Sequence, residues 1–165
     1  METPYEHGEV PSEAIFESNG KTIADFVPIN GHLTLCPEIR DLIESMEPGR
    51  HQLIPVHIHR LRSQRPIFRL DGRVLDEPYY LFQAMTFLDS VWVEKSDVRI
   101  SEGTNLLIPK PDFPNIVLRK EVTAGHHVWR ENRFPAPPLL FSDALMATID
   151  ARRYKKLDAR RVTEE

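Results

Sequence analysis

The sequence has one cysteine, few glycines and no long apolar run. Cys36 is the only cysteine among 165 residues, so no disulfide can form within the chain and the fold needs no oxidising compartment. No run reaches the roughly 18 apolar residues of a membrane-spanning helix. The chain does not begin with a basic segment followed by an apolar one, the pattern of a secretory signal. These absences predict a cytoplasmic protein without a membrane partner.

Familiar enzyme signatures are also missing. The sequence contains no Gly-x-Ser-x-Gly elbow, no His-Glu-x-x-His, no Walker loop and no dinucleotide-binding glycine pattern. Cys36 is a poor candidate nucleophile, because Pro37 and Glu38 follow it and its surroundings are acidic. We therefore expect Cys36 to be a small packing residue, and we expect no catalytic residue, metal or cofactor.

What the chain does contain is ordinary for one soluble domain, with an uneven charge distribution. Hydrophobic residues make up 41% and charged residues 28% of the sequence, and 14 prolines against 7 glycines predict many stiff connections. The net charge is −4, but residues 1–49 contain 10 acidic and 2 basic side chains, whereas residues 50–165 contain 15 and 19. We therefore distinguish an acidic N-terminal subregion over residues 1–49.

The most apolar and aromatic stretch, residues 78–96, predicts the core of the protein. Its apolar spacing from Leu81 to Leu88 fits a helix, whereas its aromatic residues favour a strand. We expect a strand or a short helix there, followed by a strand over residues 90–93.

Other local patterns predict the elements around this core. An apolar stripe that begins after Pro37 predicts an amphipathic helix over residues 37–47, and Ser142 is the expected N-cap of a C-terminal helix that continues to residue 156. Alternation predicts a strand over residues 53–61, and Asp71-Gly72 predicts a type I′ hairpin over residues 66–75. We also expect a helical turn over residues 12–17, a turn at Asn19-Gly20 and short strands over residues 21–26, 98–100, 106–108, 116–119 and 126–130.

These elements predict the α+β class. We expect a single domain with an antiparallel or mixed sheet, flanked by the N-terminal amphipathic helix and the C-terminal helix.

Four acidic residues share the polar side of the predicted helix over residues 37–47. Such a charge run is usually a solvated face, but it can also be an acidic docking surface for a cationic partner. The candidate partner-binding residues are Glu38, Asp41, Glu44 and Glu47.

Two further groups of side chains suggest alternative functions. His57 and His59 lie on one side of a predicted strand, and with His126-His127 they raise the possibility of a metal-dependent hydrolase with a zinc site. A basic tract suggests phosphate contacts, although Tyr154 is its only aromatic residue and a solvated helix end is the simpler interpretation, so we expect no nucleic-acid partner. The tract consists of Arg152, Arg153, Lys155, Lys156, Arg160 and Arg161.

The order of several segments resembles a bacterial immunity-protein family, the one numbered eleven and formerly a domain of unknown function. The resemblance covers about residues 50–160 and leaves residues 161–165 as a tail. It rests on Leu53-Ile54-Pro55-Val56, the block from Pro78 to Asp89 with Glu94-Lys95-Ser96, Gly125-His126-His127-Val128-Trp129-Arg130, and the block from Pro138 to Leu145.

The resemblance implies a function by binding. Members of this family are encoded beside polymorphic toxins and secreted effectors, including those of type VI secretion, and protect the producing cell by binding the cognate toxin. The resemblance therefore implies an immunity protein whose partner is a toxin and which occludes the toxin's active site. It supplies no catalytic residue.

Overall fold

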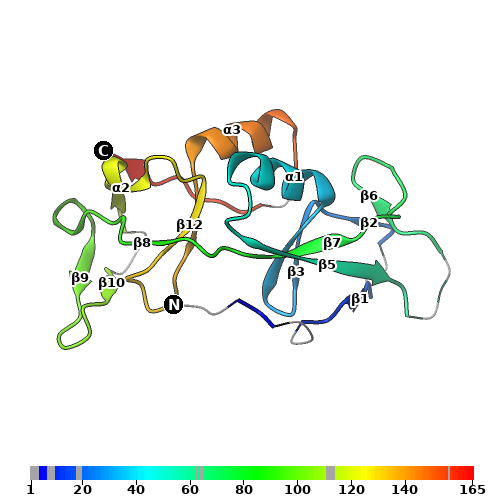
Figure 1. Ribbon diagram of the computed structural model, residues 1–165, viewed down its shortest axis with the longest axis horizontal. Coiled ribbons are helices and arrows are strands. Elements are labelled where there is room, and N and C mark those ends of the chain that lie inside the picture. Colours follow the sequence, from blue (N-terminus) through cyan, green and yellow to red (C-terminus); the bar gives the residue numbers. More distant parts are fainter. Residues whose placement is uncertain are drawn as a thin grey trace.

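A computed structural model of the protein describes residues 4–6, 10–17, 20–61, 63, 65–110, 114–155 and 157–165. Over these residues the chain is a compact mixture of strands and helices, mostly sheet with three α-helices, and none of its helices is long and apolar enough to cross a membrane (Figure 1). The elements are β1 (Glu13–Ile15), β2 (Thr22–Ile23), β3 (Phe26–Ile29), β4 (His32–Leu35), α1 (Pro37–Met46), β5 (Gln52–His59), β6 (Phe68–Arg69), β7 (Tyr79–Gln83), β8 (Phe87–Leu88), the 3₁₀ helix η1 (Val93–Lys95), β9 (Val98–Ile100), β10 (Leu107–Pro109), β11 (Val117–Leu118), α2 (Lys120–Thr123), β12 (Val128–Glu131), β13 (Leu139–Phe141), α3 (Asp143–Ala151) and β14 (Thr163–Glu164).

The largest sheet has five strands in the order β1-β5-β7-β4-β3. Its central strand, β7, pairs antiparallel with β5 and β4, whereas β1 joins β5 in parallel, so the sheet is mixed. Four of the five residues of β7 are buried. The aromatic stretch is therefore a strand at its start, because neighbours on both sides satisfy its backbone while its faces are covered.

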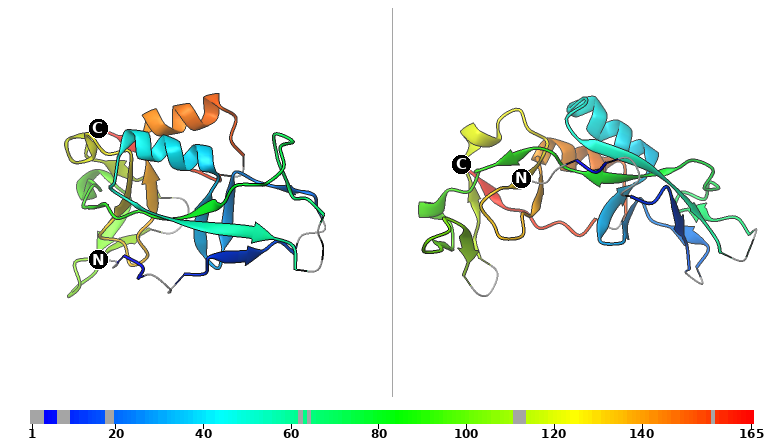
Figure 2. Two further views of the ribbon diagram at one scale, coloured as in Figure 1. Left: turned by 45° about the vertical axis from the view of Figure 1, so that its right-hand side comes forward. Right: turned by 60° about the horizontal axis from the view of Figure 1, so that its bottom comes forward.

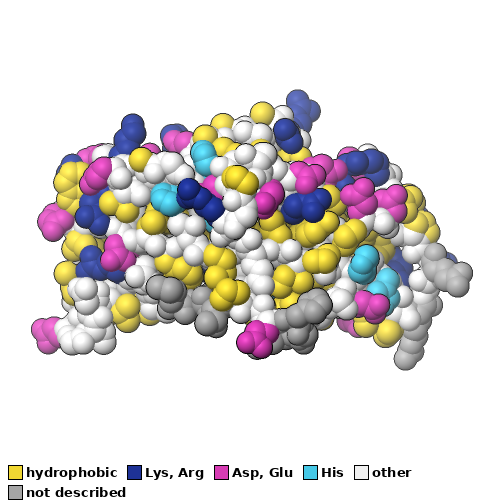
Figure 3. Space-filling view, viewed as in Figure 1, with side chains coloured by type: hydrophobic (Ala, Val, Ile, Leu, Met, Phe, Trp, Pro, Cys, Tyr) yellow, Lys and Arg dark blue, Asp and Glu magenta, His cyan; other side chains and the backbone are white. Residues whose placement is uncertain are grey.

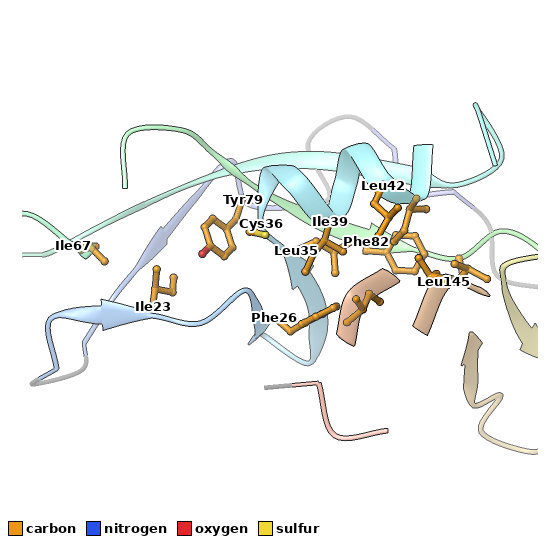
Figure 4. Close-up of a cluster of buried hydrophobic side chains, with 14 residues drawn as sticks. Ile23, Phe26, Leu35, Cys36, Ile39, Leu42, Ile67, Tyr79, Phe82 and Leu145 are labelled. Atoms are coloured by element: carbon orange, nitrogen blue, oxygen red, sulfur yellow. The ribbon is translucent and has the colours of Figure 1, made fainter. Parts of the chain in front are cut away.

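Helix α1 forms where the apolar stripe predicts it. Pro37 occupies its first turn, and Ile39, Leu42 and Ile43 are buried. Figures 1 and 2 show α1 and α3 side by side on the same side of the five-stranded sheet. Apolar residues of both helices and of the sheet form the first core cluster, in which Leu42, Phe82 and Leu145 meet (Figure 4).

The predicted cap of α3 is present. The hydroxyl oxygen of Ser142 accepts a 3.2 Å hydrogen bond from the backbone N–H of Leu145, which satisfies one of the free N–H groups of the first turn. Leu145 and Ile149 are buried, one helical turn apart. The helix ends at Ala151, so its predicted continuation to residue 156 is wrong. Arg153 has a φ of 59°, which breaks the helix.

A second core cluster lies beyond the large sheet, among the smaller sheets β13-β12-β8, β10-β9 and β11-β14. Figure 1 shows this part at the opposite end of the molecule from β6. The strands predicted over residues 98–100, 106–108, 116–119 and 126–130 are present with small shifts of their ends. The buried residues of this cluster are Val91, Val98, Leu107, Leu118, Trp129 and Phe134.

The segment after α3, which we call the C-terminal strap (residues 152–155 and 157–165), contacts both clusters. Tyr154 and Leu157 pack against the first cluster, and Val162 packs against the second. The backbone N–H of Lys155 donates a 2.8 Å hydrogen bond to the buried carboxylate of Asp25. Strand β14 then pairs in parallel with β11, so the strap connects the two parts of the molecule.

Three local predictions are corrected by long-range pairing. The segment predicted as a helical turn over residues 12–17 contains β1, because it pairs with β5. Residues 90–93 do not form a strand: Val91 makes a single bridge to Leu118, and η1 begins at Val93. The predicted strand over residues 21–26 is divided between β2 and β3. Asn19 of the predicted turn lies outside the described residues.

The hairpin around Asp71-Gly72 forms, but with a different turn. The N–H of Arg69 donates to the carbonyl of Arg73 at 2.8 Å, and the N–H of Gly72 donates to the carbonyl of Arg69 at 3.0 Å. Gly72 has a φ of 89°, whereas Asp71 is not in the left-handed region. A type I′ turn needs a positive φ at both central residues, so the loop is instead a longer one that ends on a left-handed glycine.

Candidate functional site

The predicted contact surface on α1 begins with Glu38, which is held by two arginines of the β6 hairpin. Arg69 donates to both carboxylate oxygens, at 2.8 Å to Oε1, and Arg73 donates to Oε1 at 2.5 Å. Burial opposes ionisation of Glu38, but these hydrogen bonds outweigh it and lower its pKa to about 2. The carboxylate is thus ionised and already paired, and 30% of its side chain is exposed.

Asp41 and Glu44 lie closer to solvent. The Asp41 side chain is 67% exposed and forms an ion pair with its neighbour Arg40 at 2.6 Å. Glu44 is half-buried, and its Oε1 accepts a 2.7 Å hydrogen bond from the backbone N–H of Gly49. Both carboxylates are therefore accessible from outside the molecule.

Glu47 is not on the solvated face, and the prediction that it shares that face is wrong. Its side chain is 1% exposed. Glu47 is the C-cap of α1, with φ −138° and ψ 69°, so it departs from helical geometry and its side chain points inward. Of the four predicted residues, the structure leaves Asp41, Glu44 and part of Glu38 at the surface.

Within the described part of the chain, the hydrogen bonds of the buried Glu47 carboxylate all go to one of its oxygens, Oε2. His51 Nε2 lies 2.7 Å from Oε2, and the backbone N–H of Val128 donates to the same oxygen at 2.9 Å. Because the N–H of Met85 donates to Nδ1 of His51, the proton of that ring lies on Nε2 and is donated to Glu47. Burial opposes ionisation of Glu47, but these donors lower its pKa below the ordinary value.

The histidines considered as possible metal ligands are not brought together. His57 and His59 are exposed on one side of β5, as their spacing predicts. His127 lies elsewhere, with Nδ1 at 2.9 Å from the hydroxyl of Ser142, and His126 lies beside Arg50. Among the residues that the structure describes, no three histidine, cysteine, aspartate or glutamate side chains form a group that could hold a metal ion.

The basic tract does not form one helical face, because α3 ends before it. Arg152 and Arg153 are exposed. Arg161 forms a 3.0 Å ion pair with Asp143, and Lys156 lies outside the described residues. The tract belongs to the C-terminal strap, so a truncation after Ala151 would remove β14 and core contacts together with the charges.

Cys36 is a core residue, as predicted. It is fully buried just before α1, beside Leu35 and Ile39 (Figure 4). Burial raises the pKa of its thiol to about 12, which leaves it un-ionised at neutral pH.

One surface feature has no counterpart in the sequence predictions: a cleft lined by Trp92, Arg119 and Arg133. These residues come from three separate segments and share no spacing pattern. Trp92, near the end of the apolar stretch over residues 78–96, was the only available signal. The packing of the second cluster is needed to place the arginines beside it.

Comparison with models of protein families identifies the family of the chain. A family model described as "Immunity protein family (Imm11)" matches residues 6–164. The match confirms the resemblance seen in the sequence and extends it through the acidic N-terminal subregion. No curated protein matches the chain.

Proposed function

Since the chain belongs to the Imm11 immunity protein family, we propose that it neutralises a cognate bacterial toxin by binding it directly and occluding its active site. The observation that carries the proposal is the family match across residues 6–164, nearly the whole sequence. Inhibition by occlusion needs a stable scaffold and a complementary face, and a standard interface of about 1,600 Å² is within reach of a domain of this size. The proposed setting is the cytoplasm of a cell that carries a polymorphic toxin or a type VI effector.

The proposed contact surface on α1 is the exposed part of its acidic side. Asp41 and Glu44 are the residues best placed for this role, and Glu38 contributes the exposed edge of its carboxylate. Acidic and basic side chains are interspersed on the face shown in Figure 3. The proposed acidic contact is therefore confined to these few residues and does not extend over the whole face. If the toxin is a nuclease with a cationic groove, these carboxylates imitate phosphates and accelerate association, an effect that salt weakens.

The first experiment tests neutralisation itself. A candidate toxin domain from the reading frame beside this one is expressed in a sensitive host, with or without this chain, and binding of the two purified proteins is measured. We expect co-expression to restore growth and the proteins to form a stable complex with loss of toxin activity. Growth arrest that persists despite soluble, folded chain would refute the proposal.

The second experiment tests the contact surface. In Asp41→Lys/Glu44→Lys, the association rate constant should fall, and its dependence on salt should weaken. Glu38 and Glu47 are left unchanged, because Glu38 is paired with Arg69 of the β6 hairpin and the Glu47 carboxylate is buried against the N–H of Val128. The matched control is Glu102→Lys/Glu121→Lys, which changes the net charge equally at exposed positions away from α1. Equal rates in both variants would remove this face from the interface.

A further inference from the structure

A surface cleft of about 270 Å³ lies beside η1 in the second part of the molecule. Its walls come from the segment around η1, from the residue after β11 and from the loop after β12. Val91, one of its lining residues, is buried in the second core cluster, which fixes the cleft to the core. The complete lining is Val91, Trp92, Val93, Glu94, Arg119 and Arg133.

The two arginines are positioned by neutral acceptors. Arg119 donates through Nη2 to the backbone carbonyl of Asp89, and Arg133 donates through Nη2 to Oδ1 of Asn105 at 3.2 Å. Neither guanidinium forms an ion pair with any residue of the described ranges. Nε of Arg119 is buried and has no hydrogen-bond partner there. Both guanidinium groups are therefore held in place by neutral acceptors, while the buried carboxylate of Glu131 accepts from the backbone N–H groups of Val91 and Arg133 instead.

The remaining lining completes the chemical character of the cleft. Trp92 is half-buried and supplies a flat apolar wall, and Lys95 Nζ lies 3.7 Å from the centre of its ring. Glu94 is the single acidic side chain of the lining. The ammonium of Lys95 is neutralised by a 2.5 Å ion pair with Glu165. Two guanidinium groups against one carboxylate leave the lining of the cleft positive, so its electrostatics favour an anion.

We propose that this cleft is a carboxylate-binding site that receives an acidic side chain of the partner protein. Arginine recognises carboxylates through two parallel hydrogen bonds, and a tryptophan face packs against the apolar stem of such a side chain. The volume also favours a side chain: whole small molecules occupy clefts of roughly 300–1,000 Å³. The proposal rests on the proposed function, because it assigns the acidic side chain to the toxin.

The first test measures the affinity for the cognate toxin in variants that remove either a positive or a negative charge from the cleft. Arg119→Gln and Arg133→Gln should each weaken binding by about tenfold or more, mainly through faster dissociation, because each leaves a buried carboxylate poorly paired. Glu94→Gln removes the opposing charge and should tighten binding. The control Arg152→Gln/Arg153→Gln removes two exposed positive charges elsewhere and should have little effect. Thermal unfolding of each variant shows whether its fold is intact.

A titration without the toxin separates the site from the function. The indole N–H resonance of Trp92 is followed by NMR during addition of N-acetyl-aspartate amide or of inorganic phosphate. We expect the carboxylate to shift the resonance and the arginine variants to abolish the shift. A shift with phosphate alone would overturn the assignment of a carboxylate.

The two experiments fail in different ways. If the wild-type chain binds the toxin and the folded arginine variants bind equally well, the cleft is not part of the interface and the proposed function stands. If the wild-type chain does not bind the toxin, the proposed function fails and the assignment of a partner side chain fails with it. The indole titration then decides whether the cleft binds carboxylates.

Discussion

The backbone N–H of Val128 donates a 2.9 Å hydrogen bond to Oε2 of Glu47, a residue 81 positions earlier in the sequence. The same oxygen lies 2.7 Å from Nε2 of the buried His51. One carboxylate thus joins the end of α1, the segment before β5 and the start of β12. Its removal would leave two donors without their acceptor.

We expect Glu47→Ala to lower the free energy of unfolding by roughly 2–5 kcal/mol, because buried donors that lose their acceptor keep the cost of desolvation. Urea denaturation measures the change. Glu44→Ala is the matched control, since Glu44 lies one turn earlier with a solvent-accessible carboxylate, and it should cost less than about 1 kcal/mol. Similar losses in the two variants would contradict the role assigned to the buried carboxylate.

The ion pairs of Glu38 predict a dependence of stability on pH. Its pKa in the folded protein is about 2, below the ordinary 4.5, so its ionised form stabilises the fold. This contribution is complete above pH 4.5 and is lost as the pH falls towards 2. Glu38→Gln should therefore be less stable than wild type by about 1 kcal/mol at pH 7.

The stabilities of wild type and Glu38→Gln should converge as the pH falls from 4.5 to about 2. Chemical denaturation of both proteins across this range isolates Glu38 from the other carboxyl groups, because these are common to both. A difference between the two proteins that does not change with pH would show that the charge of Glu38 contributes nothing.

The contribution of Asp25 to stability should change with pH in the opposite direction to that of Glu38. Burial raises its pKa above the ordinary 3.8, although the N–H of Lys155 and the charge of Arg69 oppose the shift. Its favourable contribution is therefore complete below pH 3.8 and is lost as the pH rises through the folded-state pKa. Asp25→Asn keeps an acceptor for Lys155 without the charge, so at pH 7 it should be at least as stable as wild type.

Asp25→Ala removes that acceptor as well and should be less stable than Asp25→Asn at pH 7. Thermal unfolding of the three proteins gives the order. If the asparagine variant is as unstable as the alanine variant, the charge of Asp25 is needed and the assigned direction of its pKa shift is wrong.

The thiol of Cys36 should be inert in the folded protein. Its side chain is fully buried and its pKa is about 12, so neither access nor ionisation favours reaction at neutral pH. A soluble aromatic disulfide reagent should modify it only after unfolding, at the rate of global opening. Rapid, complete modification under native conditions would show that the region around α1 opens locally.

The sequence predicts features that are encoded locally and misses those that depend on distant partners. Pro37 with its apolar stripe and Ser142 as N-cap locate α1 and α3, because both signals lie within one or two helical turns. The exposure of His57 and His59 follows from simple alternation along β5. Prediction of the mixed sheet and the immunity family succeeded for similar reasons, since segment order is read directly from the chain.

Glu47 shows why the candidate surface was only partly predicted. Helical spacing places it with Asp41 and Glu44, but the helix ends just before it, and donors from His51 and Val128 lie on the inner side. The sequence of β1 likewise predicts a helical turn, but its pairing with β5 makes it a strand. In both cases the conformation depends on a partner that lies far away in the sequence, which a local sequence pattern does not identify.

The C-terminal strap also has a consequence for synthesis on the ribosome. β14 leaves the exit tunnel after every strand with which it is assembled, and its partner β11 lies 46 residues earlier. A nascent chain can bury most of both clusters before then, while the edge of β11 and the contacts of Val162 are still open. The fold of the second cluster should therefore be completed only after β14 has left the ribosome, which is later than the appearance of α1.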